Sequence, residues 1–147
     1  MQYTQLGRSG LKVSRLVLGT MNFGQHTLEP DAHAMLDRAH EHGINVVDTA
    51  DVYGGTAGGG ATEEIIGRWF AQGGGRRERT VLVTKAYSSL RGFGLAEDPG
   101  TWPNTSLLSA LHIRQAVEDS LRRLRTDHLD VLLMHHVDRS TPVDEIW

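Results

Sequence analysis

Four polar side chains stand at or just past the ends of three consecutive apolar runs in this chain of 147 residues. They are a carboxylate, a phenol, an ammonium and an imidazole, supplied by Asp48, Tyr53, Lys85 and His135. Groups of these types donate, accept or stabilise protons in enzymes. Their position at successive run ends therefore indicates an active site.

The elements that must position these groups are predicted from the apolar pattern. Residues 45–50, 80–85 and 129–135 form short, continuous, β-branched runs, as expected of parallel strands covered on both faces, and residues 16–20 form a similar first run. Two shorter runs around residues 7–10 predict an N-terminal β-hairpin.

Between the runs, apolar side chains recur with the period of a helix packed on a sheet. One helix is expected from about Pro30 to His42, a second from about Thr62, a third from about Ser109, and a further one begins at residues 141–145. The first predicted apolar stripe contains Ala32, Met35, Leu36 and Ala39. The predicted fold is α/β with right-handed crossovers and a parallel sheet, in a single domain over residues 1–147.

Two nucleotide-binding loops are disfavoured. Residues 19–24 lack the G-x-G-x-x-G spacing of a Rossmann turn, although Asp48 would suit the acidic position of that fold. The glycine-rich residues 54–60 lack the Lys and Ser or Thr of a Walker loop. A (β/α)8 barrel fits better. The N-terminal hairpin matches a barrel that is closed at its bottom, and the polar residues at successive strand ends match one that is catalytic at its top. With about 250 residues per barrel, the chain supplies about four βα units, the N-terminal half.

Composition narrows the function further. There is no cysteine, which excludes disulfides, a thiolate nucleophile and zinc–thiolate sites. A net charge of -3 gives no general attraction to nucleic acid, and no run approaches the length of a membrane span. The histidines form no convincing ligand set with carboxylates, so no metal is expected. We expect a cytoplasmic protein, since the N-terminus lacks signal-peptide features.

Residues 6–14, 18–24, 48–54, 83–85 and 130–135 carry a specific resemblance in this order. The chain resembles the N-terminal half of an aldo-keto reductase. Residues 134–142 and 1–3 are also similar to bacterial members of the aryl-alcohol dehydrogenase-like and keto-sugar reductase-like branch.

The resemblance implies reduction of a small aldehyde or ketone by hydride from NADPH. It implies Tyr53 as the general acid, Lys85 and Asp48 as the pair that tunes it, and His135 as the group that orients the carbonyl. Strand alternation is expected to turn the next residue, His136, away from the site.

The resemblance also implies that Gly19, Thr20 and Met21 line the nicotinamide, with Asp48 close to it. Three aromatic residues on loops at the same end are expected to line the substrate pocket: Phe23, Tyr87 and Trp102.

Four strands cannot close a barrel, so we expect exposed edges and partly solvated inward side chains at Val17, Val47, Leu82 and Leu132. This predicts a truncated or cleaved enzyme, or one that pairs with a copy of itself or a complementary half-barrel. The chain alone is expected to bind NADPH weakly and to turn over little. A non-catalytic interaction or regulatory subunit, or an inactive fragment, is the alternative.

Overall fold

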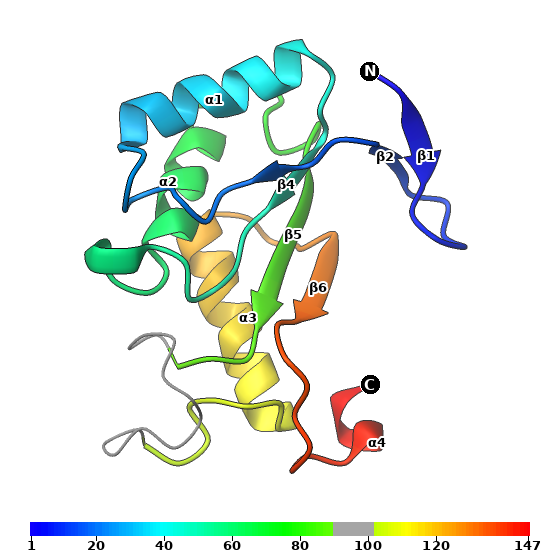
Figure 1. The fold of residues 1–147 in the computed structure, drawn as a ribbon, viewed down its shortest axis with the longest axis vertical. Coiled ribbons are helices and arrows are strands. Elements are labelled where there is room, and N and C mark those ends of the chain that lie inside the picture. The colour runs from blue at the N-terminus through cyan, green and yellow to red at the C-terminus, as the bar shows by residue number, and fades with distance from the viewer. Residues whose placement is uncertain (90–101) are drawn as a thin grey trace.

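A parallel sheet forms the centre of the computed structural model, which describes residues 1–89 and 102–147. An antiparallel hairpin precedes the sheet and helices follow its strands (Figure 1). The elements in chain order are β1 (Tyr3–Gln5), β2 (Lys12–Ser14), β3 (Leu18–Gly19), α1 (Glu29–Glu41), β4 (Val46–Asp48), the short 3-10 helix η1 (Gly55–Ala57), α2 (Ala61–Phe70), β5 (Val81–Ala86), α3 (Ala110–Leu124), β6 (Val131–Met134) and α4 (Val143–Ile146).

The strand order is β3-β4-β5-β6, with every neighbouring pair parallel. Sequential strands that are all neighbours, each joined to the next through a helix, are the arrangement of part of a (β/α)8 barrel. The predicted α/β fold, hairpin and parallel sheet are confirmed. Three strands, β3, β4 and β6, are shorter than their apolar runs, whereas β5 has the length of its run, shifted by one residue. Pairing with β5 continues past β4 through the backbone N–H of Thr49, which donates to the Val83 carbonyl at 2.9 Å.

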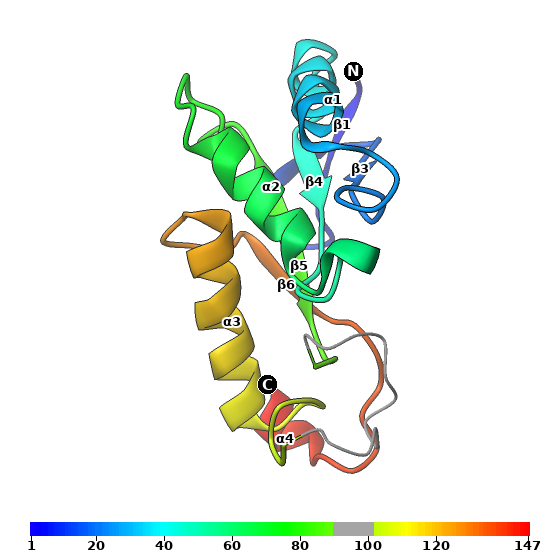
Figure 2. The same ribbon diagram turned by 90° about the vertical axis from the view of Figure 1, so that its left-hand side faces the viewer.

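The helices α2 and α3 lie against one face of the sheet, as Figure 2 shows from the side. Between these layers lies the main core, formed by Phe23, Ala32, Leu36, Val47, Ile65, Ile66, Trp69, Phe70, Leu82 and Leu124. The predicted stripe of α1 is buried except at Met35, which is 43% exposed. At about 25 cal/mol per Å² of apolar surface, this layer contact is the main favourable contribution to folding.

The expected phase of the strands is wrong at Val47, Leu82 and Leu132, the last of which pairs with Thr84 and so lies on the helix side, whereas Val17 is 52% exposed. Val47 and Leu82 were expected to face inward and be partly solvated, but they are 1% and 0% exposed and pack in the core beneath the helices. Because strand side chains alternate, the opposite face carries Val46 and Val83, which pack with Val13 of the hairpin. That face also carries Asp48 and Lys85, so the hairpin covers one end of it and the polar groups lie at the other.

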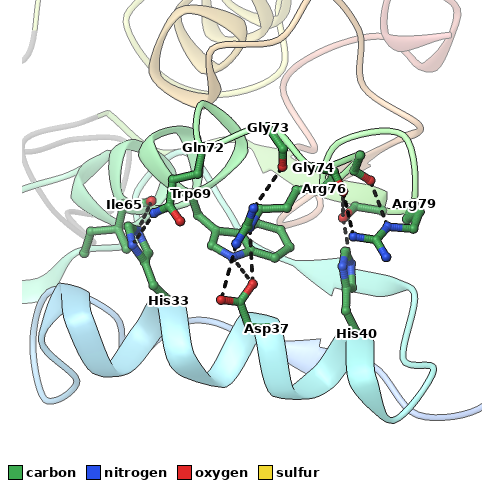
Figure 3. Close-up of polar contacts among 12 residues, drawn as sticks. His33, Asp37, His40, Ile65, Trp69, Gln72, Gly73, Gly74, Arg76 and Arg79 are labelled. Carbon is green, nitrogen blue, oxygen red and sulfur yellow. Dashed lines mark hydrogen bonds and ion pairs between the residues drawn. The ribbon is translucent and has the colours of Figure 1, made fainter.

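A polar network joins α1 to α2 and to the turn that leads into β5 (Figure 3). Asp37 accepts hydrogen bonds from the Trp69 indole at 2.9 Å and from Nε of Arg76 at 3.2 Å. The Nε2 atom of His40 lies 3.1 Å from the Thr80 hydroxyl. Burial lowers the pKa of His40, and the positive charge of Arg79 in the turn lowers it further. Its imidazole is therefore neutral near pH 7. These contacts fix the chain just before β5 begins.

A glycine-rich loop follows β4 and holds the chain beyond Tyr53. Gly54 has φ of 145°, and a Cβ at this residue would overlap the carbonyl oxygen of Gly58. The Tyr53 carbonyl accepts hydrogen bonds from Gly60 N–H at 3.1 Å and Thr62 N–H at 3.3 Å. The loop therefore returns to Tyr53 as α2 begins, a path that requires glycine at residue 54.

Candidate active site

Three of the four predicted residues converge on the ammonium of Lys85. Its Nζ donates to Oδ2 of Asp48 at 2.7 Å and to the carbonyl of Thr49 at 2.8 Å, and lies 3.4 Å from the Tyr53 phenol oxygen. The Lys85 side chain is 12% exposed. A cation this enclosed is stable because a carboxylate and a carbonyl replace its water shell.

The register of the sheet explains the convergence. Asp48 is opposite Val83 in the β4–β5 pairing, so its side chain and that of Lys85 lie on the same face. A turn then brings Tyr53 back over β5, with its N–H donating to the Ala50 carbonyl at 3.2 Å. The Tyr53 residue is 8% exposed, and Lys85 Nζ lies 4.9 Å from its ring centroid. The phenol oxygen is thereby held beside the cation.

His135 comes to the same place from β6. It follows the last residue of that strand, and its N–H continues the pairing by donating to the Ala86 carbonyl at 3.1 Å. Its ring packs edge-on against the Tyr53 ring, with centroids 5.6 Å apart. Burial, followed by the charges of Lys85 and His136, lowers the pKa of His135. The structure thus groups all four residues, with the imidazole in its neutral form near pH 7.

His136 is not turned away, and that expectation is wrong. Since β6 ends at Met134, strand alternation does not apply to the next two residues. The His136 ring stacks on His135 with centroids 5.1 Å apart and planes 18° apart, and it contacts the Tyr87 ring at 5.0 Å. The end of β6 at Met134, before both histidines, is what allows their rings to stack.

The residues expected at a nicotinamide lie beside this group. Gly19 pairs with Asp48 in the β3–β4 register, and the space that its Cβ would occupy is open. Met21 is 57% exposed. Thr20, in contrast, is fully buried, and its hydroxyl donates to the Asp48 carbonyl at 2.9 Å. An open glycine next to a carboxylate fits a flat ring that approaches the backbone, whereas the Thr20 side chain braces β4.

The three aromatic residues expected in a substrate pocket have different surroundings. Phe23 is 1% exposed and packs in the main core, so its ring is not available to a substrate. Tyr87 is half-buried against His136. Trp102 is 80% exposed and borders a surface hollow together with Thr141. Of the three, Tyr87 alone contacts the group around His135 within the described ranges.

A buried charged cluster on the helix side of the sheet was not among the predicted features. Glu63 is 0% exposed, accepts the Thr84 hydroxyl at 2.6 Å and pairs with Nε of Arg123 at 2.7 Å. Asp51 is 1% exposed; burial, and next the charge of Glu63, raise the pKa of Asp51 to about 7. Glu63 shares the helical face of Ile66 and Phe70, and an acid on an apolar stripe was the available signal.

This arrangement supports proton transfer from a phenol that lies beside an ammonium. An ammonium beside a phenol stabilises the phenolate that remains when the phenol gives up its proton. A neutral imidazole close by can hydrogen-bond to the same acceptor. Within residues 1–89 and 102–147, no group of three or more potential ligands is placed to hold a metal ion. No helix in that same part of the chain has the length and apolarity needed to cross a membrane.

The chain is similar in sequence to known proteins over nearly its whole length. Residues 15–147 match the family described as the Aldo/keto reductase family. The chain is 53% identical over 148 residues to the uncharacterized oxidoreductase YrpG of Bacillus subtilis, covering all of this chain and 44% of that protein. It is 40% identical to Protein tas of Escherichia coli, covering 96% of this chain and 40% of that protein.

A plant protein, the probable voltage-gated potassium channel subunit beta of Arabidopsis thaliana, is 38% identical over 146 residues, covering 99% of this chain and 40% of its own length. The chain therefore spans less than half of the curated relatives it matches. The family match extends over β3 to α4 and includes all four residues of the candidate site. The chain belongs to the aldo/keto reductase family.

Proposed function

We propose that this chain forms the catalytic half of an enzyme that reduces an aldehyde or ketone to an alcohol with NADPH. The observation that carries the proposal is the position of Lys85 Nζ, 2.7 Å from Asp48 and 3.4 Å from the Tyr53 oxygen. Hydride addition to a carbonyl generates an alkoxide, which needs a proton donor within hydrogen-bond reach. Tyr53 is the proposed donor.

Lys85 and Asp48 assist this transfer electrostatically. The ammonium stabilises the phenolate that Tyr53 becomes after it has protonated the alkoxide. Asp48 and the Thr49 carbonyl hold the ammonium in one position, so little reorganisation is needed during the reaction. The low exposure of both Lys85 and Tyr53 excludes water and strengthens their interaction.

His135 is proposed to orient the carbonyl from the other side of the phenol. Its lowered pKa keeps the ring neutral, so it does not add a second positive charge next to Lys85. A neutral imidazole N–H can donate to the carbonyl oxygen while Tyr53 donates from the adjacent position. Two donors then converge on the oxygen that gains negative charge.

Gly19, Met21 and Asp48 are the residues proposed to contact the nicotinamide. When bound, the cofactor supplies the hydride. The open space at Gly19 lets a planar ring approach the backbone, and Asp48 lies beside it in the register. Thr20 is proposed to hold Asp48 in place beside the nicotinamide, because its hydroxyl and its backbone N–H both donate to the Asp48 carbonyl.

The relatives are more than twice as long as this chain, so turnover is proposed to require barrel strands beyond β6. These would come from the same polypeptide, a copy of it or a complementary half. We propose residues 1–147 as one partial domain. For the chain alone we expect weak NADPH binding and little turnover. Strong enhancement of nicotinamide fluorescence at micromolar NADPH would contradict this.

Tyr53→Phe tests the assignment of the acid. In the complete enzyme we expect NADPH oxidation with an aldehyde substrate to fall by about 10²-fold or more, the usual contribution of general acid catalysis. Tyr3→Phe is the matched control, because Tyr3 is 45% exposed and its hydroxyl bonds to the Gly43 carbonyl. Unchanged turnover in Tyr53→Phe would remove Tyr53 from this role.

A second candidate function is a non-catalytic subunit that binds another protein. The observation that favours it is the similarity to the plant protein named as a potassium channel subunit beta. The two functions differ in their dependence on Tyr53. Partner capture that is unaffected by Tyr53→Phe, in a complete protein without reductase activity, would support the subunit function.

A further inference from the structure

Asp51 is a buried carboxyl in the same turn as Tyr53. It is 1% exposed, and its Oδ1 atom has no hydrogen-bond partner among the described residues, so the carboxylate form is costly to bury. Its own N–H donates to the Lys85 carbonyl at 3.1 Å. Asp51 therefore ties the turn to β5 at the residue that carries the ammonium of the candidate site.

The charges that face Asp51 already balance one another. α2 contributes Glu63 and α3 contributes Arg123, and these two form an ion pair at 2.7 Å. β5 contributes the hydroxyl of Thr84, which donates to Glu63. A protonated Asp51 keeps this enclosed cluster neutral. An ionised Asp51 would place a second carboxylate near Glu63 with one guanidinium for both.

Tyr53 is bonded to both sides of this cluster. Its N–H donates to Ala50, next to Asp51, while its carbonyl accepts from Gly60 and Thr62, at the start of the helix that carries Glu63. Repulsion between Asp51 and Glu63 acts to separate the turn from α2. The backbone of Tyr53 is therefore bonded to both of the segments on which this repulsion acts.

Asp51 gains and loses its proton in a pH range in which the folded chain can be studied. Burial, and next the negative charge of Glu63, raise its pKa to about 7, while Arg123 and the backbone N–H groups of Val52 and Tyr87 oppose the rise. The ordinary value for this carboxyl is 3.8. Asp51 therefore exchanges its proton near neutral pH instead of in acid.

We propose that Asp51 is a positioning residue for Tyr53: its protonated carboxyl keeps the phenol beside Lys85, and its ionisation moves the phenol away. The consequence for turnover rests on the proposed function. The displacement itself is a property of this chain and can be measured without substrate or cofactor.

The test is NMR of the purified chain with tyrosine isotope-labelled at Cζ, titrated from about pH 5 to about pH 9. The chain has three tyrosines, so the Tyr53 signal can be assigned from its loss in Tyr53→Phe. We expect a step in this signal with a midpoint near neutral pH. The step should disappear in Asp51→Asn. It should persist in Glu64→Gln, the control, because Glu64 is next to Glu63 on α2 but its side chain is 55% exposed.

Glu63→Gln provides a second measurement that does not require Asp51→Asn to fold. Removal of the like charge should shift the midpoint to lower pH by about one unit or more. His135 also titrates, and its ring is 5.6 Å from that of Tyr53. A step that persists in Asp51→Asn but disappears in His135→Asn would overturn the proposal, as would the absence of any step in the wild type.

These outcomes are separate from those of the proposed function. If no carbonyl is reduced by the complete enzyme, the catalytic assignment fails while the Tyr53 titration keeps its meaning. If turnover is found but the Tyr53 signal ignores Asp51 and Glu63, the positioning role alone is refuted. If turnover of the complete enzyme falls above neutral pH, and this fall is absent in Asp51→Asn, then the positioning role of Asp51 affects catalysis.

Discussion

Replacement of Arg123 by methionine should destabilise the chain strongly, because it leaves Glu63 buried without its cation. Glu63 is 0% exposed and makes two short contacts, 2.6 Å to Thr84 and 2.7 Å to Arg123. Loss of one partner of a buried ion pair costs about 3–5 kcal/mol. Since the Arg123 side chain retains 13% exposure, some water can reach the vacated position, and we expect a loss of about 3 kcal/mol.

The measurement is urea unfolding at neutral pH, followed by tryptophan fluorescence. Trp69 is 0% exposed, whereas Trp102 and Trp147 are 80% and 81% exposed, so the change on unfolding reports chiefly on Trp69. Arg122→Met is the matched control: its side chain is 75% exposed and pairs with Asp119 on the surface. That control should change the free energy of unfolding by no more than about 0.5 kcal/mol.

The double variant Glu63→Gln with Arg123→Met distinguishes loss of the charge partner from loss of packing. The glutamine amide still accepts the Thr84 hydroxyl, and no uncompensated charge remains buried. We therefore expect the double variant to recover most of the lost stability. If Arg123→Met costs less than about 1 kcal/mol, or if the double variant is as unstable as the single one, the interpretation of this cluster is refuted.

Three further predictions concern stability. The pKa of Asp51 is raised to about 7 in the folded chain, so the unfolded chain binds fewer protons between about pH 4 and 7. The free energy of unfolding should therefore fall by up to about 4 kcal/mol as the pH rises through that window. Asp51→Asn should remove this fall, as measured by urea unfolding at a series of pH values. Burial alone would raise the pKa of Asp138, but hydrogen bonds from Ser140, Thr141 and Leu108 hold it well below its ordinary value. Asp138→Asn should therefore lose about 1–3 kcal/mol at neutral pH, with the loss fading as pH falls through the acid range; an equal loss at every pH would contradict this. Trp69→Phe removes the indole bond to Asp37 and should cost about 1–3 kcal/mol in thermal unfolding, more than Trp147→Phe, whose side chain is exposed.

The candidate site was predictable because its residues follow strand ends. Asp48 ends β4, Lys85 is the last residue but one of β5, and His135 follows β6; parallel strands bring these ends together. The family motifs supplied the identity of Tyr53, which lies in a loop that periodicity does not describe. The convergence at Lys85 Nζ is then a consequence of register.

The wrong predictions concern the face on which a strand residue lies and the burial of a loop residue. Val47 and Leu82 were assigned to the wrong face, although Asp48 and Lys85 at neighbouring positions already set the alternation. His136 was assigned by alternation beyond the point at which β6 ends. Phe23 was placed with the substrate because it lies on a loop, whereas its burial depends on contacts with helices far away in sequence.

The Glu63 cluster shows what one-dimensional reasoning could not supply. Its members come from α2, α3 and β5, and their pairing depends on how closely the two helices approach. Gly67 allows that approach, because a Cβ there would overlap the Arg123 carbonyl. The sequence contains the acid and the base, but their meeting is a result of helix packing.

Two adjacent residues of β5 contact carboxylates on opposite faces of the sheet. Thr84 contacts the anionic Glu63 on the helix side, and Lys85 contacts Asp48 on the other side. A slip of β5 by one residue would exchange these faces, moving the ammonium of Lys85 into the buried Glu63–Arg123 ion pair and leaving Asp48 without a cation. The same charges proposed to perform chemistry thus also penalise misaligned strand pairing while the chain folds, so substitutions at Lys85 should increase misfolding even in a protein that never meets a substrate.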